Sequence, residues 1–254
     1  MASLLESLFK WLLILSLAAM ALAYHKKDRL PGPDYYDLAL LKDPVQQETR
    51  AKPFIVQADD YIYQITPRYE YELNGVVVSY HDADAIDDVA HHKRWMDFLN
   101  LRDICVVWDQ NITSQFYKKA HFHNDTWTCW TQWEDRQTGE LFNGTQLSNN
   151  HILSTDPYLN KQILSAEVGD QIRLSGILAN YKNPSNGFYR KTSTIRTDTG
   201  NGACETIYVT DFEVIKKANS GWRNIYQGAK WFAITSLVGF FIMLFIAPVR
   251  RGIK

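Results

Sequence analysis

The sequence has little net charge. It holds 27 Lys and Arg residues against 28 Asp and Glu residues, which leaves a formal charge of −1 at pH 7. No broad positive field is therefore available to attract nucleic acid, which is not expected as a partner. Internal repeats and low-complexity tracts are lacking as well. In contrast, 46% of the residues are hydrophobic and 13% aromatic, enough for one core of ordinary domain size.

Long apolar runs are confined to the two ends of the chain. The run WFAITSLVGFFIMLFIAPV, residues 231–249, contains no charge. As a helix rising about 1.5 Å per residue it would span roughly 28 Å, close to the hydrocarbon thickness of a bilayer. The sequence therefore predicts a transmembrane helix at 231–249, after a juxtamembrane segment at 218–230 and before a basic cytoplasmic tail at 250–254.

The N-terminal apolar run leaves two interpretations open. WLLILSLAAMALAY ends in Ala21-Leu22-Ala23, a pattern typical of signal-peptidase cleavage. The basic residues that follow it oppose export and favour an uncleaved anchor. Residues 1–24 are thus a signal peptide or an N-terminal membrane anchor. Both interpretations make the protein integral to the cell (inner) membrane and place residues 25–229 on the extracytoplasmic side.

Strand-like segments dominate the middle of the chain. A stalk or linker is expected at 25–53, where prolines and charges mix, followed by an exported β-rich domain at 54–217. Most candidate strands alternate polar with β-branched or aromatic residues, and two short helices are expected within 86–101 and 155–169. The predicted fold is mainly β (α+β): a small β-barrel or sandwich with two short helices, flanked by membrane segments.

The stretch VGDQIRLSGILANY at 168–181 carries a family resemblance. A Gly-Asp turn leads into alternating residues, and Gly176 stands where a strand could bend. The inward-facing side chains are expected to be Ile172, Leu174, Ile177 and Leu178. Residues 168–215 resemble OB-fold modules, in which such a stretch is the opening strand. This resemblance implies a five-stranded barrel and does not by itself imply nucleic-acid binding.

The chain has three cysteines, so in an oxidising compartment one is left over when two pair. Cys105 lies in the apolar run ICVVW and is the expected buried free thiol. Cys129 with Cys204 is the favoured disulfide. Cys105 with Cys129 is the alternative.

Two groups of polar residues are candidate sites. His81, Asp82, Asp84 and His91 are ligand types that zinc or calcium accepts, although their spacing matches no defined motif and a solvated loop would look the same. No cofactor is expected. His151 is the first choice for an active site and would meet the other catalytic candidates, Arg196 and Asp198.

The segment RTDTGNGACET, residues 196–206, is predicted to be a hairpin turn with Gly200, Asn201 and Gly202 at positive φ. Aromatic spacing predicts an exposed binding surface. The candidate ligand- or partner-binding residues are Trp127, Trp130, Asn150 and His151.

Three functions remain open at this point. The first is a membrane-anchored exported β-barrel domain that acts as a binding or assembly module with a protein partner in a cell-envelope complex. The second is an exported hydrolytic enzyme, in one version metal-dependent. The third is an OB-like binder of oligosaccharide or single-stranded nucleic acid.

Overall fold

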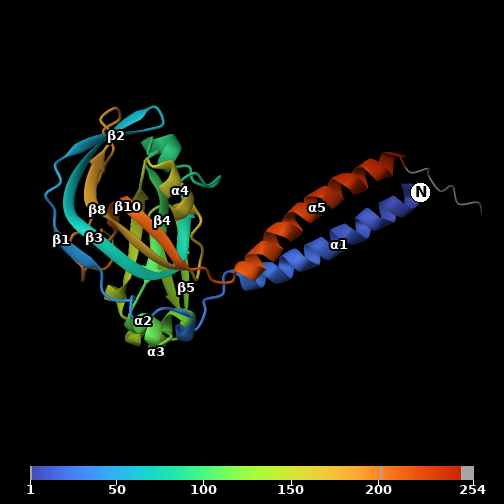
Figure 1. The fold of residues 1–254 in the computed structure, drawn as a ribbon, viewed down its shortest axis with the longest axis horizontal. Coiled ribbons are helices and arrows are strands. Elements are labelled where there is room, and N and C mark those ends of the chain that lie inside the picture. The colour runs from blue at the N-terminus through green and yellow to red at the C-terminus, as the bar shows by residue number, and fades with distance from the viewer. Residues whose placement is uncertain (1, 201, 247–254) are drawn as a thin grey trace, which may run out of the picture. The chain divides into compact units, whose positions relative to one another are not determined.

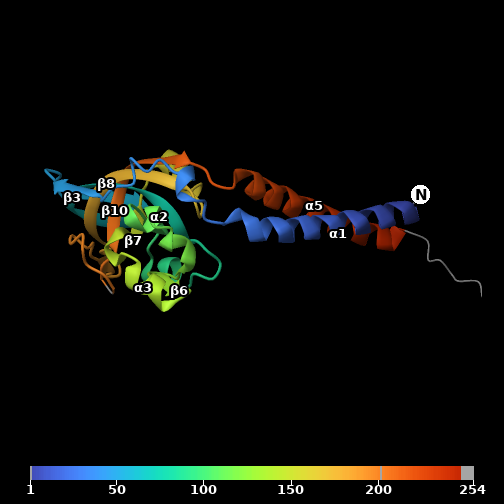
Figure 2. The same cartoon turned by 90° about the horizontal axis from the view of Figure 1, so that it is seen from below.

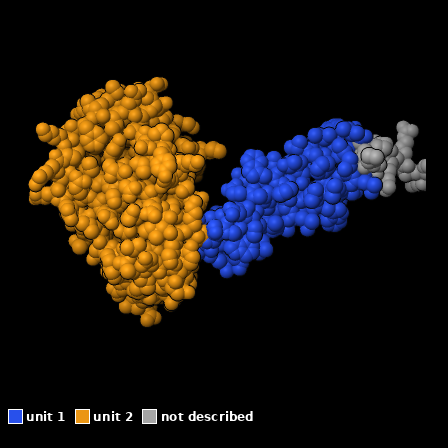
Figure 3. Space-filling view, viewed as in Figure 1, with its two compact units in different colours: residues 1–29, 219–254 blue, residues 30–218 orange. Residues whose placement is uncertain are grey.

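The computed structural model describes residues 2–200 and 202–246. They belong to two compact units, coloured separately in Figure 3. One unit contains the two ends of the chain, up to Arg29 and from Asn219 onward. The other contains residues 30–218.

The terminal unit is a pair of long helices, α1 (Ala2–Lys27) and α5 (Ser220–Ile246), which lie side by side (Figure 1). They run antiparallel. Near one end the rings of Tyr24 and Tyr226 are 6.2 Å apart, and near the other a Cβ added to Gly239 would lie 2.6 Å from Cε1 of Phe9. Glycine at 239 therefore lets the two helices approach closely.

Both helices are long and apolar enough to cross a membrane. The qualifying segments are Leu4–Lys27, of 24 residues, and Ser220–Ile246, of 27 residues, and little of either is buried. α5 begins eleven residues before the predicted span at 231–249, so most of the expected juxtamembrane segment is helical. The last residues of that span and the predicted basic tail at 250–254 lie outside the described residues.

The other unit is a mixed α+β domain with an eight-stranded sheet (Figures 1 and 2). The strands of the sheet are β1 (Val45–Glu48), β2 (Phe54–Ala58), β3 (Tyr61–Asp82), β4 (Asn100–Val107), β7 (Leu147–Leu153), β8 (Gln171–Lys182), β9 (Tyr189–Arg190) and β10 (Glu205–Lys216). A separate hairpin is formed by β5 (Ala120–Asn124) and β6 (Cys129–Trp133). The short helical segments are η1 (Pro33–Tyr35), η2 (His91–Trp95), α2 (Gln110–Thr113), η3 (Phe116–Lys119), α3 (Arg136–Leu141), η4 (Gly144–Gln146) and α4 (Pro157–Leu164).

Five of these strands pair in a ring. The sheet order runs β3-β4-β7-β10-β8, and β8 pairs again with β3. All of these pairings are antiparallel except that of β7 with β10. β3 can pair with both β4 and β8 because it is 22 residues long. Its pairing with β8 shifts register after Pro67, which cannot donate a ladder hydrogen bond.

Most of the hydrophobic core lies between the strands of this ring. Its fully buried side chains include Leu73, Ile104, Ile152, Leu174 and Ile207, one from each of the five strands. Strand alternation was therefore a sound basis for expecting a β-rich core, and the coarse prediction of a mainly β, α+β domain is consistent with the structure.

The OB-like stretch forms β8 as a strand, but its position differs from the expectation. β8 is the fourth strand of the ring in chain order, not the opening one. Ile172, Leu174 and Leu178 are buried in the core as expected. Ile177 is only half-buried, because strict alternation from Leu174 turns it to the other face.

The predicted helix at 155–169 is confirmed in part as α4. Asp156 caps it by accepting hydrogen bonds from the backbone N–H groups of Tyr158 and Leu159, and Pro157 occupies the first turn. The predicted helix at 86–101 is wrong. Only the π-helical turn η2 forms there, and the apolar side chains of Ile86 and Val89 are exposed instead of facing a core.

Residues 30–53, expected as part of a stalk, contribute to the β domain. β1 pairs with β3, and Tyr36 and Leu41 are buried in the main core. The segment 196–206 is not a simple hairpin turn, since β9 before it pairs with β8 whereas β10 after it pairs with β7 and β8. Gly200 and Gly202 do have positive φ, and Asn201 lies outside the described residues.

Candidate functional site

One row of side chains crosses four strands of the ring. His81 on β3 stands opposite Asp103 on β4, Asp103 opposite His151 on β7, and His151 opposite Thr206 on β10. Residues directly opposite each other point to the same side of a sheet. The register of the strands therefore brings two histidines and a carboxylate together on one face.

Asp103 and His151 form a buried pair at the centre of this row. His151 Nδ1 lies 2.6 Å from Asp103 Oδ1, and neither side chain has any exposed surface. The guanidinium of Arg190 on β9 contacts the other ring nitrogen, Nε2. Because arginine can only donate, Nε2 accepts and the proton of the ring is on Nδ1, facing the carboxylate. Burial lowers the pKa of His151 to about 4, although Asp103 opposes the shift.

The network continues from Asp103 toward β3. Asn100 Nδ2 donates to Asp103 Oδ1 at 2.9 Å and lies 3.0 Å from His91 Nε2. An amide nitrogen can only donate, so His91 carries its proton on Nδ1, where it donates to Asp88 Oδ2 at 2.6 Å. His81 Nε2 contacts the same oxygen at 2.8 Å. A continuous buried chain of polar groups therefore links His81 to Arg190.

Asp88 is held as a carboxylate within this chain. Its burial alone would raise the pKa, but hydrogen bonds from His91, both ring and backbone, and from His81 outweigh it and bring the pKa to about 2. Asp88 Oδ1 accepts from the backbone N–H groups of Ala90 and His91. Only Oδ2 therefore faces the two imidazole rings.

Trp127 lies over this network. Its ring centroid is 4.5 Å from that of His91 and 5.1 Å from that of His151. The guanidinium carbon of Arg190 stands 3.4 Å above the Trp127 ring, a cation–π contact. Trp95 packs on the same indole at 4.6 Å. The aromatic side chains separate the histidines from the cleft and leave Arg190 at its edge.

The cleft has a volume of about 880 Å³. Its lining includes Trp127, Trp130, Arg190, Arg196, Asp198 and Cys204. Large apolar and aromatic surfaces with a few charged groups are typical of ligand and partner sites. The residues come from the β5–β6 hairpin, from β7, and from the segment between β8 and β10, which are far apart in the sequence.

An ion pair between Arg196 and Glu205 lines the cleft. The Arg196 guanidinium contacts Glu205 Oε1, and Glu205 is 1% exposed. Burial raises the pKa of Glu205 to about 7, against the lowering effect of Arg196. Arg196 is therefore paired with the buried Glu205, whereas Arg190 contacts the neutral His151 ring and the face of Trp127 and interacts electrostatically with Asp103.

The predicted disulfide between Cys129 and Cys204 is wrong. Cys105 on β4 is bonded to Cys129 on β6, with Cα atoms 5.8 Å apart, and Cys204 is a free thiol. The apolar run buried Cys105 as expected, but the β5–β6 hairpin packs on β4, within disulfide reach. The disulfide thus ties the hairpin, with Trp127 and Trp130, to the ring.

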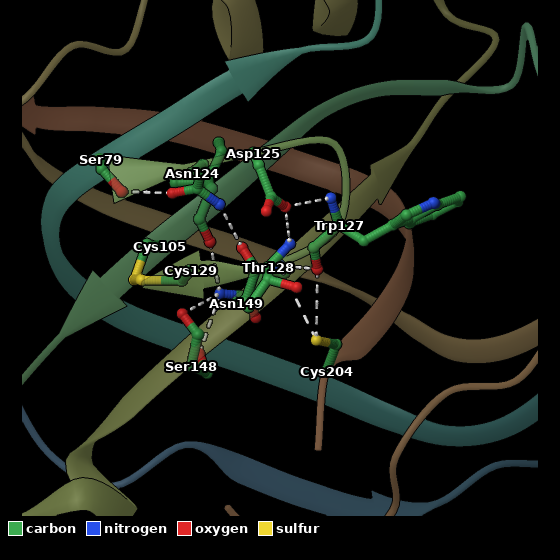
Figure 4. The surroundings of a disulfide bond; sticks show 12 residues. Ser79, Cys105, Asn124, Asp125, Trp127, Thr128, Cys129, Ser148, Asn149 and Cys204 are labelled. Carbon is green, nitrogen blue, oxygen red and sulfur yellow. Dashed lines mark hydrogen bonds between the residues drawn. A yellow bond between two sulfur atoms is a disulfide. The ribbon is translucent and has the colours of Figure 1, made fainter. Parts of the chain in front are cut away.

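Figure 4 shows Asn149 between this disulfide and Cys204. Asn149 stands opposite Cys105 in the β4–β7 ladder, and its Nδ2 lies 3.8 Å from Cys204 Sγ. Its Oδ1 accepts a 2.7 Å hydrogen bond from Asn124. Burial raises the pKa of the Cys204 thiol, opposed by the charge of Arg190. A nucleophilic role for this thiol gains no support from these surroundings.

The structure brings some of the predicted site residues together and separates others. Trp127, Trp130, Arg196 and Asp198 line the cleft. His151 contacts Asp103 and Arg190 instead of Arg196 and Asp198. Asp198 accepts a hydrogen bond from Ser193 at 2.6 Å. Asn150 is buried, and its amide donates to the carbonyl of Ile104.

The candidate metal ligands also separate. His81 and His91 meet at Asp88, within 4.8 Å. Asp82 pairs with Arg102, and Asp84 is exposed.

Asp103, Asn100 and Arg190 are not among the residues predicted from the sequence. Asp103 had one available signal, a charged residue directly before the apolar run ICVVW. Arg190 had none, because only the fold brings β9 next to the row on β3, β4 and β7. A scan against protein-family models found no match, and neither did searches of curated proteins and of solved structures. The fold and site thus define the chain coarsely, as a β domain with a charged aromatic cleft carried by two apolar terminal helices.

Proposed function

We propose that this protein is a membrane-anchored binding module, whose β domain lies outside the cytosol and holds a partner protein of a cell-envelope complex in the cleft. The observation that carries the proposal is the cleft of about 880 Å³ with Trp127, Trp130 and Arg190 on its wall. Trp and Arg are the side chains that contribute most strongly to protein interfaces. The complementary segment of the partner carries an acidic group for Arg190 beside an apolar one for the indoles.

Anchoring at both ends is supported by the terminal unit. α1 and α5 expose large apolar side chains such as Leu15, Phe232 and Phe241, which a bilayer would cover. α1 packs along α5 from Phe9 to Tyr24, and cleavage after residue 23 would remove that packing. The uncleaved anchor is therefore favoured over the signal peptide.

The extracytoplasmic side is supported by two independent features. Arg250, Arg251 and Lys254 follow the second apolar run, and basic residues collect on the cytoplasmic side of a membrane. The Cys105–Cys129 disulfide belongs in an oxidising compartment.

The five-strand ring fits a small barrel of the OB type. OB modules bind ligands with the second and third strands and with the loops after the first and fourth strands. The corresponding loops here are residues 83–99 and 183–204, and the second of them supplies Arg190 and Arg196 to the cleft. The analogy with OB modules supports this face of the domain as a binding surface, but it does not identify the ligand.

A hydrolytic role is less well supported. A general base needs a free nitrogen or oxygen near the reacting proton. Both ring nitrogens of His151 are engaged, Nδ1 by Asp103 and Nε2 by Arg190. His151 instead positions Arg190 at the cleft.

Site-specific photocrosslinking in intact cells tests the binding role. A benzophenone amino acid at Trp130 is expected to give one discrete adduct, while the same group at Tyr158, an exposed aromatic on α4 outside the cleft, gives none. Equal labelling from both positions, or none from Trp130, contradicts the proposal. The side of the membrane is tested separately with Tyr189→Cys in a Cys204→Ser chain, which should react with a membrane-impermeant maleimide without permeabilisation.

A further inference from the structure

His81, Asp88 and His91 form a compact group of metal-ligating side chains. One ligand atom from each lies within 4.8 Å of the others. Asp88 Oδ2 lies 2.8 Å from His81 Nε2 and 2.6 Å from His91 Nδ1. The side chains of Asp88 and His91 are fully buried, and that of His81 is 13% exposed. We propose that these three residues bind one divalent first-row transition metal ion, of which Zn²⁺ is the reference.

The donor set fits this class of ion. Two imidazole nitrogens and one carboxylate oxygen are a common three-residue set for zinc and for divalent iron, with the remaining positions open to water. Asp88 offers a single oxygen, since Oδ1 is held by the backbone of Ala90 and His91. Magnesium and calcium prefer an all-oxygen set and are disfavoured here.

The residues around the group support a cation. Three buried carboxyl groups belong to the network, those of Asp88, Asp97 and Asp103, none more than 5% exposed. Asp97 is linked to it by its backbone N–H, which donates to the His91 carbonyl at 2.8 Å. The network contains one guanidinium, that of Arg190. The carboxylates of Asp88 and Asp103 outnumber this guanidinium, so a bound cation would offset buried negative charge.

The proton positions also allow metal binding. In the metal-bound form His91 Nδ1 faces the ion, and its proton moves to Nε2, beside the Asn100 amide. Asn100 Oδ1 is buried and has no hydrogen-bond partner. Rotation of the amide lets this oxygen accept from His91 Nε2, at the cost of the bond from Asn100 Nδ2 to Asp103, which keeps its bond from His151. Asn100 is thus a positioning residue for the ligand.

Metal binding can be measured on the full chain without an affinity tag. The protein is purified in detergent, stripped with EDTA, and titrated with Zn²⁺ in a Cys204→Ser background so that the free thiol does not compete. We expect one Zn²⁺ per chain by mass spectrometry, and two imidazole ligands by X-ray absorption. Less than half an equivalent at saturating Zn²⁺ overturns the proposal.

Variants separate this site from adventitious binding. His81→Gln should weaken Zn²⁺ binding by roughly 100-fold or more, because loss of even an outer-shell partner typically costs about 10–100-fold. His123→Gln, on the exposed face of β5, is the matched control and should leave binding unchanged. Because His81 is at the edge of the group, its variant is expected to fold, which circular dichroism can establish. Asp88→Asn is a second variant in which Zn²⁺ binding is measured. Full binding retained in both variants overturns the assignment, whatever the outcome for the cleft.

Discussion

Asp103 on β4 and His151 on β7 face each other across the sheet, with 2.6 Å between Oδ1 and Nδ1 and no exposed surface on either side chain. Oδ1 of Asp103 also accepts from Asn100. The carboxylate is therefore the centre at which the two halves of the buried network join.

Replacing Asp103 by Ala should destabilise the domain by about 3–5 kcal/mol, since it removes the negative charge that acts on Arg190, the acceptor of His151 Nδ1–H and one acceptor of the Asn100 amide. Urea unfolding of the full chain in detergent, followed by tryptophan fluorescence, measures the loss. Asp87→Ala, at an exposed position of the following loop, should change stability by less than about 0.5 kcal/mol. A loss below about 1 kcal/mol for Asp103→Ala would mean that the pair of Asp103 and His151 contributes little to the stability of the domain.

Glu205 should make stability depend on pH. Its pKa rises from 4.5 to about 7 on folding, mainly through burial, so the folded state binds the proton more tightly than the unfolded state. Stability contributed by this group is therefore highest at low pH and falls as pH rises from about 4.5 to about 7. The unfolding free energy of wild type relative to Glu205→Gln should decline across that window.

Glu213, an exposed residue of the same strand, provides the control. Glu213→Gln should unfold in parallel with wild type at every pH. If Glu205→Gln does so as well, burial does not shift the pKa of Glu205.

Loss of the disulfide should cost about 3 kcal/mol, because Cys105 and Cys129 are 24 residues apart and the closed loop restricts the unfolded chain. The double variant Cys105→Ala, Cys129→Ala tests this by urea unfolding. Cys204→Ser should lose less than about 1 kcal/mol. Peptide mapping under non-reducing conditions that finds Cys204 joined to Cys129 would contradict the observed pairing.

Gly176→Ala should destabilise the domain by about 1–3 kcal/mol. A Cβ at this position would approach the carbonyl of Tyr208 and lie 2.9 Å from the Cα of Val209, where β8 and β10 cross closely. The comparison is Gly144→Ala, whose nearest neighbour is Thr199 Cγ2 at 3.6 Å. Equal stability of the two variants would show that the strands can separate without cost.

Strand alternation was enough to anticipate the β domain but not the site. β8 and β10 were recognisable from their period of two, and α4 from Asp156 and Pro157, because these signals are local. The helical spacing of apolar residues at 86–101 led to a wrong prediction, because this segment forms a turn. There the Asp88 side chain binds the backbone of Ala90 and His91, and Met96 adopts a left-handed φ of 50°, which ends the turn.

The site depends on long-range register, which no local pattern encodes. His81, Asp103 and His151 meet only because three strands pair with a particular alignment, and a slip of one residue would turn each to the opposite face. Of the four candidate metal ligands, the two histidines lie together, and they meet at Asp88. Asp82 is held by Arg102 and Asp84 is exposed, so neither joins this group.

The ring of pairings also has a temporal consequence for biosynthesis. β3 remains without one neighbour until β8 is made, and β10 is the last strand to leave the ribosome, only a few residues before α5 begins. Such non-local pairing is slow compared with helix formation. Closure of the ring must therefore wait until nearly the whole domain has been translated, although β3 can pair with β1, β2 and β4 earlier.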